Sequence, residues 1–378
     1  MRVVRFSNLD ELNPWADDWD RLASGVPFRS WTWLSHWWRH YGRRHRLAVL
    51  GVFDDADALQ GLAPWYLDRS TLSGRVLRQL GSGEVCSDYL GLLAQPASEE
   101  AVIEAIAEYL AGDDGGRFRW DLLDLDGIDA DDRVTGALVQ ALAIAGCTVH
   151  RRSELNCWRL ELPVDWDSYV ASLGKNLRRD LHRLERDLVH TNRVKLHPVD
   201  CIDDLPKAMA ILVTLHQRRR EMLGERGCFA SPEFLGFHRD VAPELLRHGQ
   251  AQFFWMELDG RPVAAEYLLA GNGILYAYQS GVDPTVLQHQ PGKLNNLAIV
   301  RAAIEQGYRA LDFLRGDEPY KARFGARPRP SLQWRIVPSH PVAKARHNLW
   351  LAGRELKHLG KRGLETWTKP SQAPVPNP

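Results

Sequence analysis

Residues 288–321, QHQPGKLNNLAIVRAAIEQGYRALDFLRGDEPYK, contain the pattern that decides the fold: a turn, a helix and a strand in succession. The turn is centred on Pro291-Gly292-Lys293, and apolar residues then recur at helical spacing from 294 to about 306. Gly307 stands where a helix C-cap belongs, and a short apolar strand follows at 310–314. Free amides at the start of such a helix form a natural anion site, because the N–H groups and the helix dipole both face the ligand. An ordinary loop–helix–strand unit without a ligand is the alternative interpretation.

The composition indicates a globular protein of two ordinary domains. The chain has 378 residues, of which 44% are hydrophobic, and it holds 48 basic and 48 acidic residues. This balance gives no indication of nucleic acid as a partner. The charge is nevertheless uneven, since residues 341–378 carry seven lysines and arginines against two acids. We expect a basic helix at about 343–359 and a disordered, proline-rich tail after it.

Targeting and redox signals favour a cytoplasmic protein. The first residues, MRVVRFSNLDELNPW, lack the apolar core of a signal peptide, and no run of about 18 apolar residues predicts a membrane span. The five cysteines show neither a CxxC motif nor the Cys/His spacing of a metal site. Such scattered thiols suit a reducing cytosol, and the sequence suggests no metal.

Two similar runs of elements predict the domain organisation. Hairpins are expected at 47–67 and 251–269, and the segment WDLLDLDG at 120–127 resembles LDFLRGDE at 311–318 in pattern. We therefore predict an α/β fold made of two copies of one unit, each with a mostly antiparallel central sheet flanked by helices. The predicted boundaries are 1–160 for the first copy, 161–340 for the second, and 341–378 for the basic helix and tail.

Two helices carry side chains with more than one interpretation. In residues 30–42, Trp33, Trp37, Trp38 and Tyr41 share one helix face, which is typical of a core stripe or of the wall of a cleft. A basic helix is expected at 168–190, at the start of the second copy, with leucines along one face. Its basic residues, Arg179 among them, either form a solvated face or contact an anionic substrate.

Short motifs are spread over residues 25–335. They are Ser87-Asp88-Tyr89, Leu215-His216-x-x-Arg219, Gly260-x-Pro262-Val263-Ala264-Ala265, Tyr276-x-Tyr278, Pro291-Gly292, and Asp312-Phe313-Leu314-Arg315 with Tyr320-Lys321. In this order they resemble the CelD/BcsL group of GNAT-fold acetyltransferases, which is itself similar to the FemAB peptidyltransferases with their two GNAT units.

The resemblance implies transfer of an acetyl or other acyl group from an acyl-CoA to an amine or hydroxyl of a small-molecule or saccharide acceptor. The pyrophosphate of acetyl-CoA would lie against the amides of Gly292, Lys293 and Leu294. The turn keeps only the first glycine of the usual GNAT signature, and Pro291 has no N–H. A FemAB-like enzyme would use an aminoacyl-tRNA instead of acyl-CoA.

Three residues are candidates for catalysis. Attack by an amine needs a base to take its proton. Glu266 shares a strand face with Ala264 and Leu268, so it either points inward as that base or is a charge on an edge strand. Asp312 lies at the end of the next strand and either takes part or pairs with Arg315. Lys321 matches the Tyr-Lys motif, where it would stabilise charge or be an ordinary surface lysine.

Six further residues are expected to bind substrate from their positions in the family motifs. They are Asp88, Arg179, His216, Arg219, Tyr278 and Arg315. Two other functions remain open: a FemAB-like aminoacyl transferase, or a non-catalytic accessory protein of polysaccharide biosynthesis. The sequence does not indicate the oligomeric state.

Overall fold

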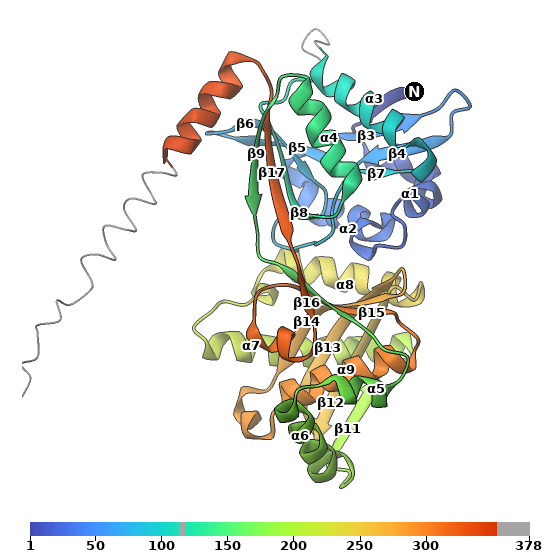
Figure 1. Cartoon of the computed structure of the whole chain (residues 1–378), viewed down its shortest axis with the longest axis vertical. Coiled ribbons are helices and arrows are strands. Elements are labelled where there is room, and N and C mark those ends of the chain that lie inside the picture. Colours follow the sequence, from blue (N-terminus) through green and yellow to red (C-terminus); the bar gives the residue numbers. More distant parts are fainter. Residues whose placement is uncertain (113–117, 354–378) are drawn as a thin grey trace, which may run out of the picture.

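The computed structural model describes residues 1–112 and 118–353, in which the chain forms two α/β units stacked along its long axis (Figure 1). Each unit consists of β-sheet flanked by helices, so the predicted fold class is confirmed. The C-terminal helix is helical over 341–353, and the predicted proline-rich tail lies outside the described residues.

The N-terminal unit has two sheets where one was predicted. Their strand orders are β1-β3-β4-β7 and β2-β5-β6-β8-β17-β9. The predicted hairpin is present, but its strands are interrupted at Ala48 and Pro64, so each half joins a different sheet. Pro64 has no N–H to donate, which explains a break in the ladder there. The elements of this unit are β1 (Arg2–Phe6), α1 (Ala16–Leu22), α2 (Trp31–Tyr41), β2 (Arg46–Leu47), β3 (Val49–Phe53), β4 (Leu59–Ala63), β5 (Trp65–Ser70), β6 (Gly74–Gln79), β7 (Leu93–Ala94), α3 (Glu99–Ala111), β8 (Leu122–Asp129), α4 (Arg133–Ile144), β9 (Thr148–Ser153) and the late strand β17 (Ser331–Val337).

The C-terminal unit has one sheet of seven strands in the order β11-β12-β13-β14-β15-β10-β16. All neighbours are antiparallel except β14 and β15, which are parallel and joined by α9. The elements are β10 (Cys157–Glu161), α5 (Trp166–Ser172), α6 (Lys175–Leu184), β11 (Val194–Pro198), α7 (Leu205–Met222), α8 (Pro232–Arg247), β12 (Ala251–Leu258), β13 (Arg261–Gly271), β14 (Ile274–Val282), α9 (Pro291–Glu305), β15 (Ala310–Arg315), α10 (Pro319–Arg323) and β16 (Arg327–Arg329).

Both units contain a strand–helix–strand motif of the same kind. In the N-terminal unit β6 pairs with β8 only over 76–78 and 122–124, and α3 connects them. In the C-terminal unit β14 pairs with β15 only over 274–276 and 310–312, and α9 connects them. In each case the two strands continue beyond these residues without pairing further with each other. This agrees with the predicted internal repeat.

The two units are joined by strands that cross between them. β17 follows β16 directly in the chain, yet it lies between β8 and β9 in the N-terminal unit (Figure 1). β9 and β10 are likewise consecutive and belong to different sheets. The domain boundaries at 160 and 340 remain predictions, and the crossing strands mean that neither sheet is built from one continuous segment.

A continuous apolar core also connects the units. Trp33 and Trp37 of α2 are buried in it, which supports the core interpretation of the aromatic stripe. The Trp33 ring contacts Phe237 of α8 at 4.9 Å between centroids, edge to face. The helices of the two units therefore pack directly against each other.

The basic helix predicted at 168–190 is interrupted. α5 ends at Ser172, Leu173 is extended, and α6 begins at Lys175 with Gly174 as its N-cap. A π-helical turn, Glu185–Val189, continues α6. The break follows from Gly174, which favours a helix boundary over a helix interior. The predicted apolar stripe is nevertheless real, since Leu181, Leu184 and Leu188 are buried.

Candidate active site

A cavity of about 830 Å³ lies in the C-terminal unit between α6, the start of α9 and α10. The end of β14 forms part of its wall. It is lined by Gly174, Lys175, Asn176, Leu177, Asp180, Ser280, Val282, Gly292, Lys293, Asn295, Asn296, Tyr320, Arg323 and Phe324. We call it the α9 pocket.

The first turn of α9 presents one free amide to this pocket. Gln290 precedes the helix in a left-handed conformation with φ +53°, and Pro291 occupies the first helical position. The amides of Lys293 and Leu294 both donate to the Gln290 carbonyl, at 3.0 and 3.1 Å. The Gly292 amide has no acceptor in the described part of the chain. One N–H at the positive end of a helix dipole is therefore available to an anion.

The three residues predicted to bind the cofactor have different surroundings. Gly292 and Lys293 line the α9 pocket, whereas Leu294 is 7% exposed and packs in the core. The Lys293 ammonium forms an ion pair with Asp180 of α6 at 2.5 Å. This pair holds α6 against α9 across the pocket, and the Asp180 carboxylate neutralises the charge of the Lys293 ammonium.

Glu266 is placed behind the pocket wall. It lies on β13, a central strand whose neighbours place Phe254 and Ser280 opposite it, so the edge-strand interpretation is wrong. The side chain is 3% exposed, and its Oε2 accepts a hydrogen bond from Asn295 Nδ2 at 2.5 Å. Burial raises the pKa of Glu266 to about 8, although the Asn295 bond acts to lower it. The carboxyl therefore changes charge near neutral pH.

Asn295 connects this carboxyl to the cavity. It lines the pocket, is 2% exposed, and has a buried Oδ1 with no hydrogen-bond partner in the described part of the chain. A buried acceptor without a donor is costly, so this atom is suited to receive a hydrogen bond from a ligand.

Tyr320 and Lys321 follow each other on α10 but have different roles in the structure. Tyr320 lines the pocket, and burial together with the charges of Glu318 and Glu266 raises the pKa of its phenol. Lys321 is 2% exposed and its Nζ donates to the carbonyls of Leu314, Arg315 and Gly316 at 3.0, 3.1 and 3.0 Å. The surface-lysine interpretation is therefore wrong, and the ammonium holds the turn after β15.

Asp312 and Arg315 do not pair with each other. Asp312 is 0% exposed, and its carboxylate accepts from the Tyr89 hydroxyl at 2.5 Å, from Arg159 Nε at 3.0 Å and from the Leu314 amide at 2.8 Å. Burial raises its pKa, and these partners oppose the rise. Because Tyr89 belongs to the N-terminal unit, Asp312 links the two units.

Arg315 makes the second link between the units. Its guanidinium binds Asp88 at 2.8 Å and lies 3.7 Å from Glu154. Asp88 is 2% exposed, whereas the Arg315 side chain is 23% exposed, so the carboxylate of the pair is buried between the units and the guanidinium is half-buried. The predicted residues Asp88, Asp312 and Arg315 therefore come together, but at the interface and outside the α9 pocket.

The remaining predicted substrate residues are dispersed. His216 of α7 is buried against Phe229, and burial lowers its pKa. Arg219 lies on the same helix. The Tyr278 hydroxyl donates to the Val85 carbonyl at 2.8 Å, which makes it a further contact between the units. Arg179 is exposed in a basic groove that meets the α9 pocket at Lys175.

Sequence patterns missed several residues that line the pocket. Asn295 lies three positions after Gly292 and so shares its helix face, which was the available signal. Tyr320 was recognised as part of a motif but not as a site residue. Ser280 and Asp180 carry no local signal, because they reach the pocket only through strand pairing and through the packing of α6 on α9.

Comparisons with known proteins agree on the kind of fold. Residues 173–322 match a family model described as an acetyltransferase (GNAT) domain. Among solved structures, FemX is similar with a TM-score of 0.61 at 12% identity, over 91% of this chain and 99% of that one. The C-terminal domain of a putative lysylphosphatidylglycerol synthetase from Agrobacterium fabrum has a TM-score of 0.54 at 12% identity, over 92% and 96% of the two chains. No curated protein matches this chain in sequence.

These likenesses extend over most of the chain but concern the fold alone, because identity is only 12%. The matched GNAT domain includes β13, α9 and most of α10, the elements that surround the α9 pocket. Within residues 1–112 and 118–353, no helix combines the length and apolarity needed to cross a bilayer. In the same residues no three His, Cys, Asp or Glu side chains are grouped so that they could hold a metal.

Proposed function

We propose that the protein is an acyltransferase that takes an acetyl or longer acyl group from acyl-CoA and transfers it to an amine or hydroxyl of a small-molecule or saccharide acceptor. The observation that carries the proposal is the α9 pocket, which is lined by the free Gly292 amide and by Asn295, the residue that binds the buried, titratable Glu266 carboxyl behind the wall. These residues lie within the part of the chain that matches a GNAT domain. The CelD/BcsL assignment and the saccharide acceptor rest on the resemblance of the sequence motifs, and the cytoplasmic location rests on the targeting and redox signals of the sequence.

The pocket has the features that an acyl-CoA donor needs. Its volume of about 830 Å³ suits an extended ligand arm. The Gly292 amide offers a hydrogen bond to a phosphate at the start of α9. Lys175 and Arg323 add positive charge to the lining, while Asp180 is already paired with Lys293. The donor's phosphates would therefore lie near α6 and the start of α9.

Glu266 and Tyr320 assist the proton transfers of the proposed reaction. The acceptor nitrogen or oxygen attacks the thioester carbonyl, the new C–N or C–O bond forms, and the C–S bond breaks. Glu266 takes the acceptor's proton through a pocket water, since its Oε1 has no partner in the described residues. The Tyr320 phenol donates a hydrogen bond to the leaving thiolate, which takes its proton from solvent. Asn295 holds the Glu266 carboxylate and offers its Oδ1 to the acceptor.

Five of the predicted site residues do not contact substrate in this proposal: Asp312, Lys321, Asp88, Arg315 and Tyr278. Their polar groups are engaged with other parts of the protein, at the interface or at the turn after β15. We therefore assign them to the positioning of β14, β15 and α10 around the pocket. His216 and Arg219 remain candidates for acceptor binding.

Calorimetric titration with acetyl-CoA, and with longer acyl-CoAs in parallel, tests the proposal. A Cβ at Gly292 would meet only Val282 Cγ2, at 3.7 Å, so Gly292→Phe is expected to fold and to block the pocket. Gly136→Phe on α4 is the matched control, because a Cβ there meets nothing within 4 Å. We expect micromolar binding by the wild type and the control, and at least about a hundredfold loss in Gly292→Phe. Absence of binding to every acyl-CoA would refute the proposed donor.

A second donor is favoured by a separate observation. A groove of about 470 Å³ on α6 is lined only by basic side chains and meets the α9 pocket at Lys175. The other five are Arg178, Arg179, His182, Arg183 and Arg186. Such a surface suits a polyanion, and the resemblance to FemAB enzymes implies aminoacyl-tRNA as donor.

Charge substitutions on α6 separate the two donors. Arg179→Gln with Arg183→Gln would weaken tRNA binding steeply and make it less dependent on salt. Acyl-CoA binding, centred on the start of α9, would change only modestly. A protein that binds tRNA but no acyl-CoA would favour the aminoacyl-transfer function, and one that binds neither would favour an accessory role.

A further inference from the structure

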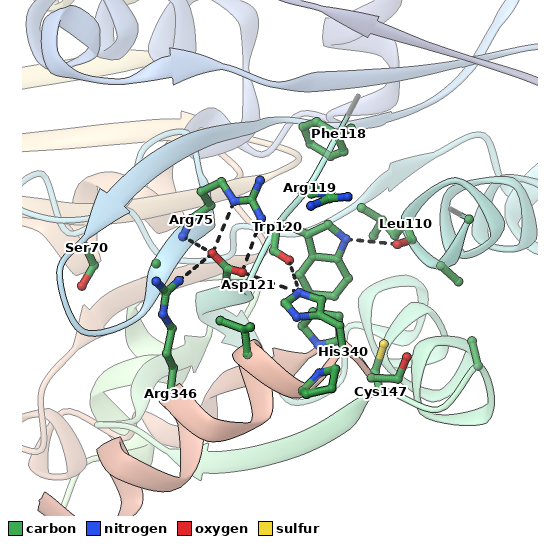
Figure 2. A pocket seen from close by; sticks show the side chains of 18 of the residues that line it. Ser70, Arg75, Leu110, Phe118, Arg119, Trp120, Asp121, Cys147, His340 and Arg346 are labelled. Carbon is green, nitrogen blue, oxygen red and sulfur yellow. Dashed lines mark hydrogen bonds and ion pairs between the residues drawn. The ribbon is translucent and has the colours of Figure 1, made fainter. Parts of the chain in front are cut away.

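A second large cavity, of about 900 Å³, lies in the N-terminal unit and shares no lining residue with the α9 pocket (Figure 2). It is formed where β6 and β8 begin, at the ends of α3 and α4, and by residues 338–346. We call it the β6–β8 pocket. The connection from the end of β6 to the start of α3 is the counterpart of the turn that precedes α9. The β6–β8 pocket lies at the other ends of these two elements, where β6 starts and α3 ends.

Asp121 is the fixed centre of this pocket. Its carboxylate accepts from the Arg75 amide at 2.7 Å, from Arg75 Nε at 3.3 Å and from Arg346 Nη1 at 2.9 Å (Figure 2). The side chain of Asp121 is 4% exposed. Two guanidinium groups therefore already neutralise the single negative charge.

His340 contacts three groups at the edge of this centre. Its Nε2 lies 3.2 Å from the Trp120 carbonyl, and its Nδ1 accepts from the Ala343 amide at 3.2 Å. Its Nε2 also lies 3.6 Å from Asp121 Oδ1 (Figure 2). His340 thus connects residues 338–346 to the segment of Trp120 and Asp121.

Gly74 shows how closely the centre is packed. It has φ +76°, and a Cβ at this position would overlap both Arg346 Nη1 and Asp121 Oδ2. Only glycine combines this conformation with the space that the arginine needs. The local backbone is therefore shaped around the Arg346–Asp121 contact.

The lining carries more positive charge than the Asp121 carboxylate neutralises. Arg69 and Arg119 also line the pocket, which gives four arginines against one aspartate. Both are exposed, and neither guanidinium has a hydrogen-bond or ion-pair partner among the described residues. A depression lined by one sign of charge concentrates the field and attracts ions of the other sign.

Apolar side chains form the rest of the lining. Leu110, Phe118 and Val342 lie beside the arginines in the same cavity. Guanidinium groups form paired hydrogen bonds with carboxylate and phosphate oxygens. The combination suits an anionic head group joined to an apolar body.

We infer that the β6–β8 pocket binds a small organic anion, whose carboxylate or phosphate is held by Arg69 and Arg119 beside the Asp121 centre and whose apolar part lies against Leu110 and Phe118. Residues 341–353 dock on the sheet through the Asp121–Arg346 contact, the packing of Ala343 and the Trp350 ring against Arg335. The two unpaired arginines have no part in that docking. The inference is independent of the acyl-transfer proposal.

The experiment is a titration of the full chain with four probes. Phenyl phosphate and octanoate present the two head groups on an apolar body, inorganic phosphate presents the charge alone, and 1-octanol presents the body alone. The variants are Arg69→Gln with Arg119→Gln, and Arg44→Gln as an exposed arginine outside the cavity. We expect phenyl phosphate or octanoate to bind with a Kd below about 1 mM, and the better binder identifies the head group.

The double variant should weaken that binding at least about tenfold, and Arg44→Gln should leave it unchanged. Both substituted arginines are exposed and unpaired, so the melting temperature should be unaltered. The inference is overturned if neither organic anion binds, if the double variant binds them as the wild type does, or if phosphate alone or octanol binds equally well.

Discussion

At the scale of single residues, Glu266 shows how burial determines chemistry. An isolated glutamate would be ionised at neutral pH, but here the surrounding strands and α9 remove it from water. The single Asn295 bond offsets only part of this cost. The result is a carboxyl whose pKa of about 8 suits a proton acceptor near neutral pH.

The raised pKa of Glu266 predicts a specific pH dependence of stability. Between its ordinary pKa of 4.5 and about 8 the folded protein holds a proton that the unfolded chain has lost. The free energy of unfolding is thus highest below the unfolded pKa of 4.5. It falls by up to about 1.4 kcal/mol per pH unit until the pH has passed about 8. Glu266→Gln lacks this loss, so it should become more stable relative to the wild type as pH rises from about 5 to 8.

Urea unfolding of wild type and Glu266→Gln across this pH range measures the effect. The difference between the two free energies should grow with pH and level off above about 8. Parallel curves would mean that the Glu266 carboxyl keeps an ordinary pKa. Acyl transfer by the same variant should fall by about a hundredfold or more and lose its rise with pH.

Lys321 is a structural cation, and its removal should cost stability. Lys321→Met would leave the carbonyls of Leu314, Arg315 and Gly316 without their donor. We expect a loss of about 2–4 kcal/mol in the free energy of unfolding, because buried acceptors would remain unsatisfied. Lys195→Met, at an exposed position, is the control and should change it by less than about 0.5 kcal/mol. Equal effects in the two variants would contradict this role.

The residue-scale predictions from sequence succeeded where local periodicity determines orientation. Strand alternation placed Glu266 on one face with Ala264 and Leu268, and these side chains are buried, as are those on the opposite face of β13. The partners of Asp312 and Arg315 were not predictable, because they come from the distant segment that holds Tyr89 and Asp88. Nothing in the neighbouring sequence records those contacts.

At the scale of elements, the packing of α7 on β14 depends on Gly281. A Cβ at Gly281 would lie 2.8 Å from the His216 amide nitrogen, 2.8 Å from Leu215 Cβ and 2.9 Å from the Leu212 carbonyl oxygen. Two of these atoms belong to the α7 backbone and cannot move independently. The helix therefore approaches the strand as closely as glycine permits.

Gly281→Ala should consequently push α7 away from β14. We expect a destabilisation of about 1–3 kcal/mol, which is the usual cost of overpacking. Gly136→Ala, in the interior of α4 with no atom within 4 Å of the new Cβ, should instead stabilise by about 0.5–1 kcal/mol through helix propensity. Chemical denaturation of both variants gives the comparison, and a neutral Gly281→Ala would show that the helix can shift freely.

Helical and strand periodicity located α2, α9 and both hairpins closely. Interruptions were harder to predict. The leucine stripe continues on both sides of Gly174, so the sequence pattern did not predict the break between α5 and α6. The division of the N-terminal hairpin at Ala48 and Pro64 depends on which sheet each half joins, which is a tertiary choice.

At the scale of the whole molecule, the crossing strands make each unit depend on the other. β17 lies between β8 and β9, so the N-terminal unit is completed by residues that follow the C-terminal unit. Asp312 and Arg315 bind Tyr89 and Asp88 across the same interface. Sequence repeats predicted two copies of one motif, but a repeat contains no information on which sheet a terminal strand joins.

This arrangement predicts that the units do not fold separately. A fragment of residues 1–156 lacks β17, which leaves β8 and β9 without the strand that joins them. We expect this fragment to show no cooperative thermal transition by circular dichroism, and the whole chain to show a single one. A cooperative transition in the fragment would mean that residues 1–156 are an independent domain.

The central claim is that the α9 pocket holds the acyl donor, and a crystal structure of the protein with bound acetyl-CoA tests it most directly. The account predicts the pyrophosphate at the Gly292 amide and the thioester beside Asn295 and Tyr320, in front of Glu266. Acetyl-CoA bound elsewhere, or its thioester directed away from Asn295, would contradict the account.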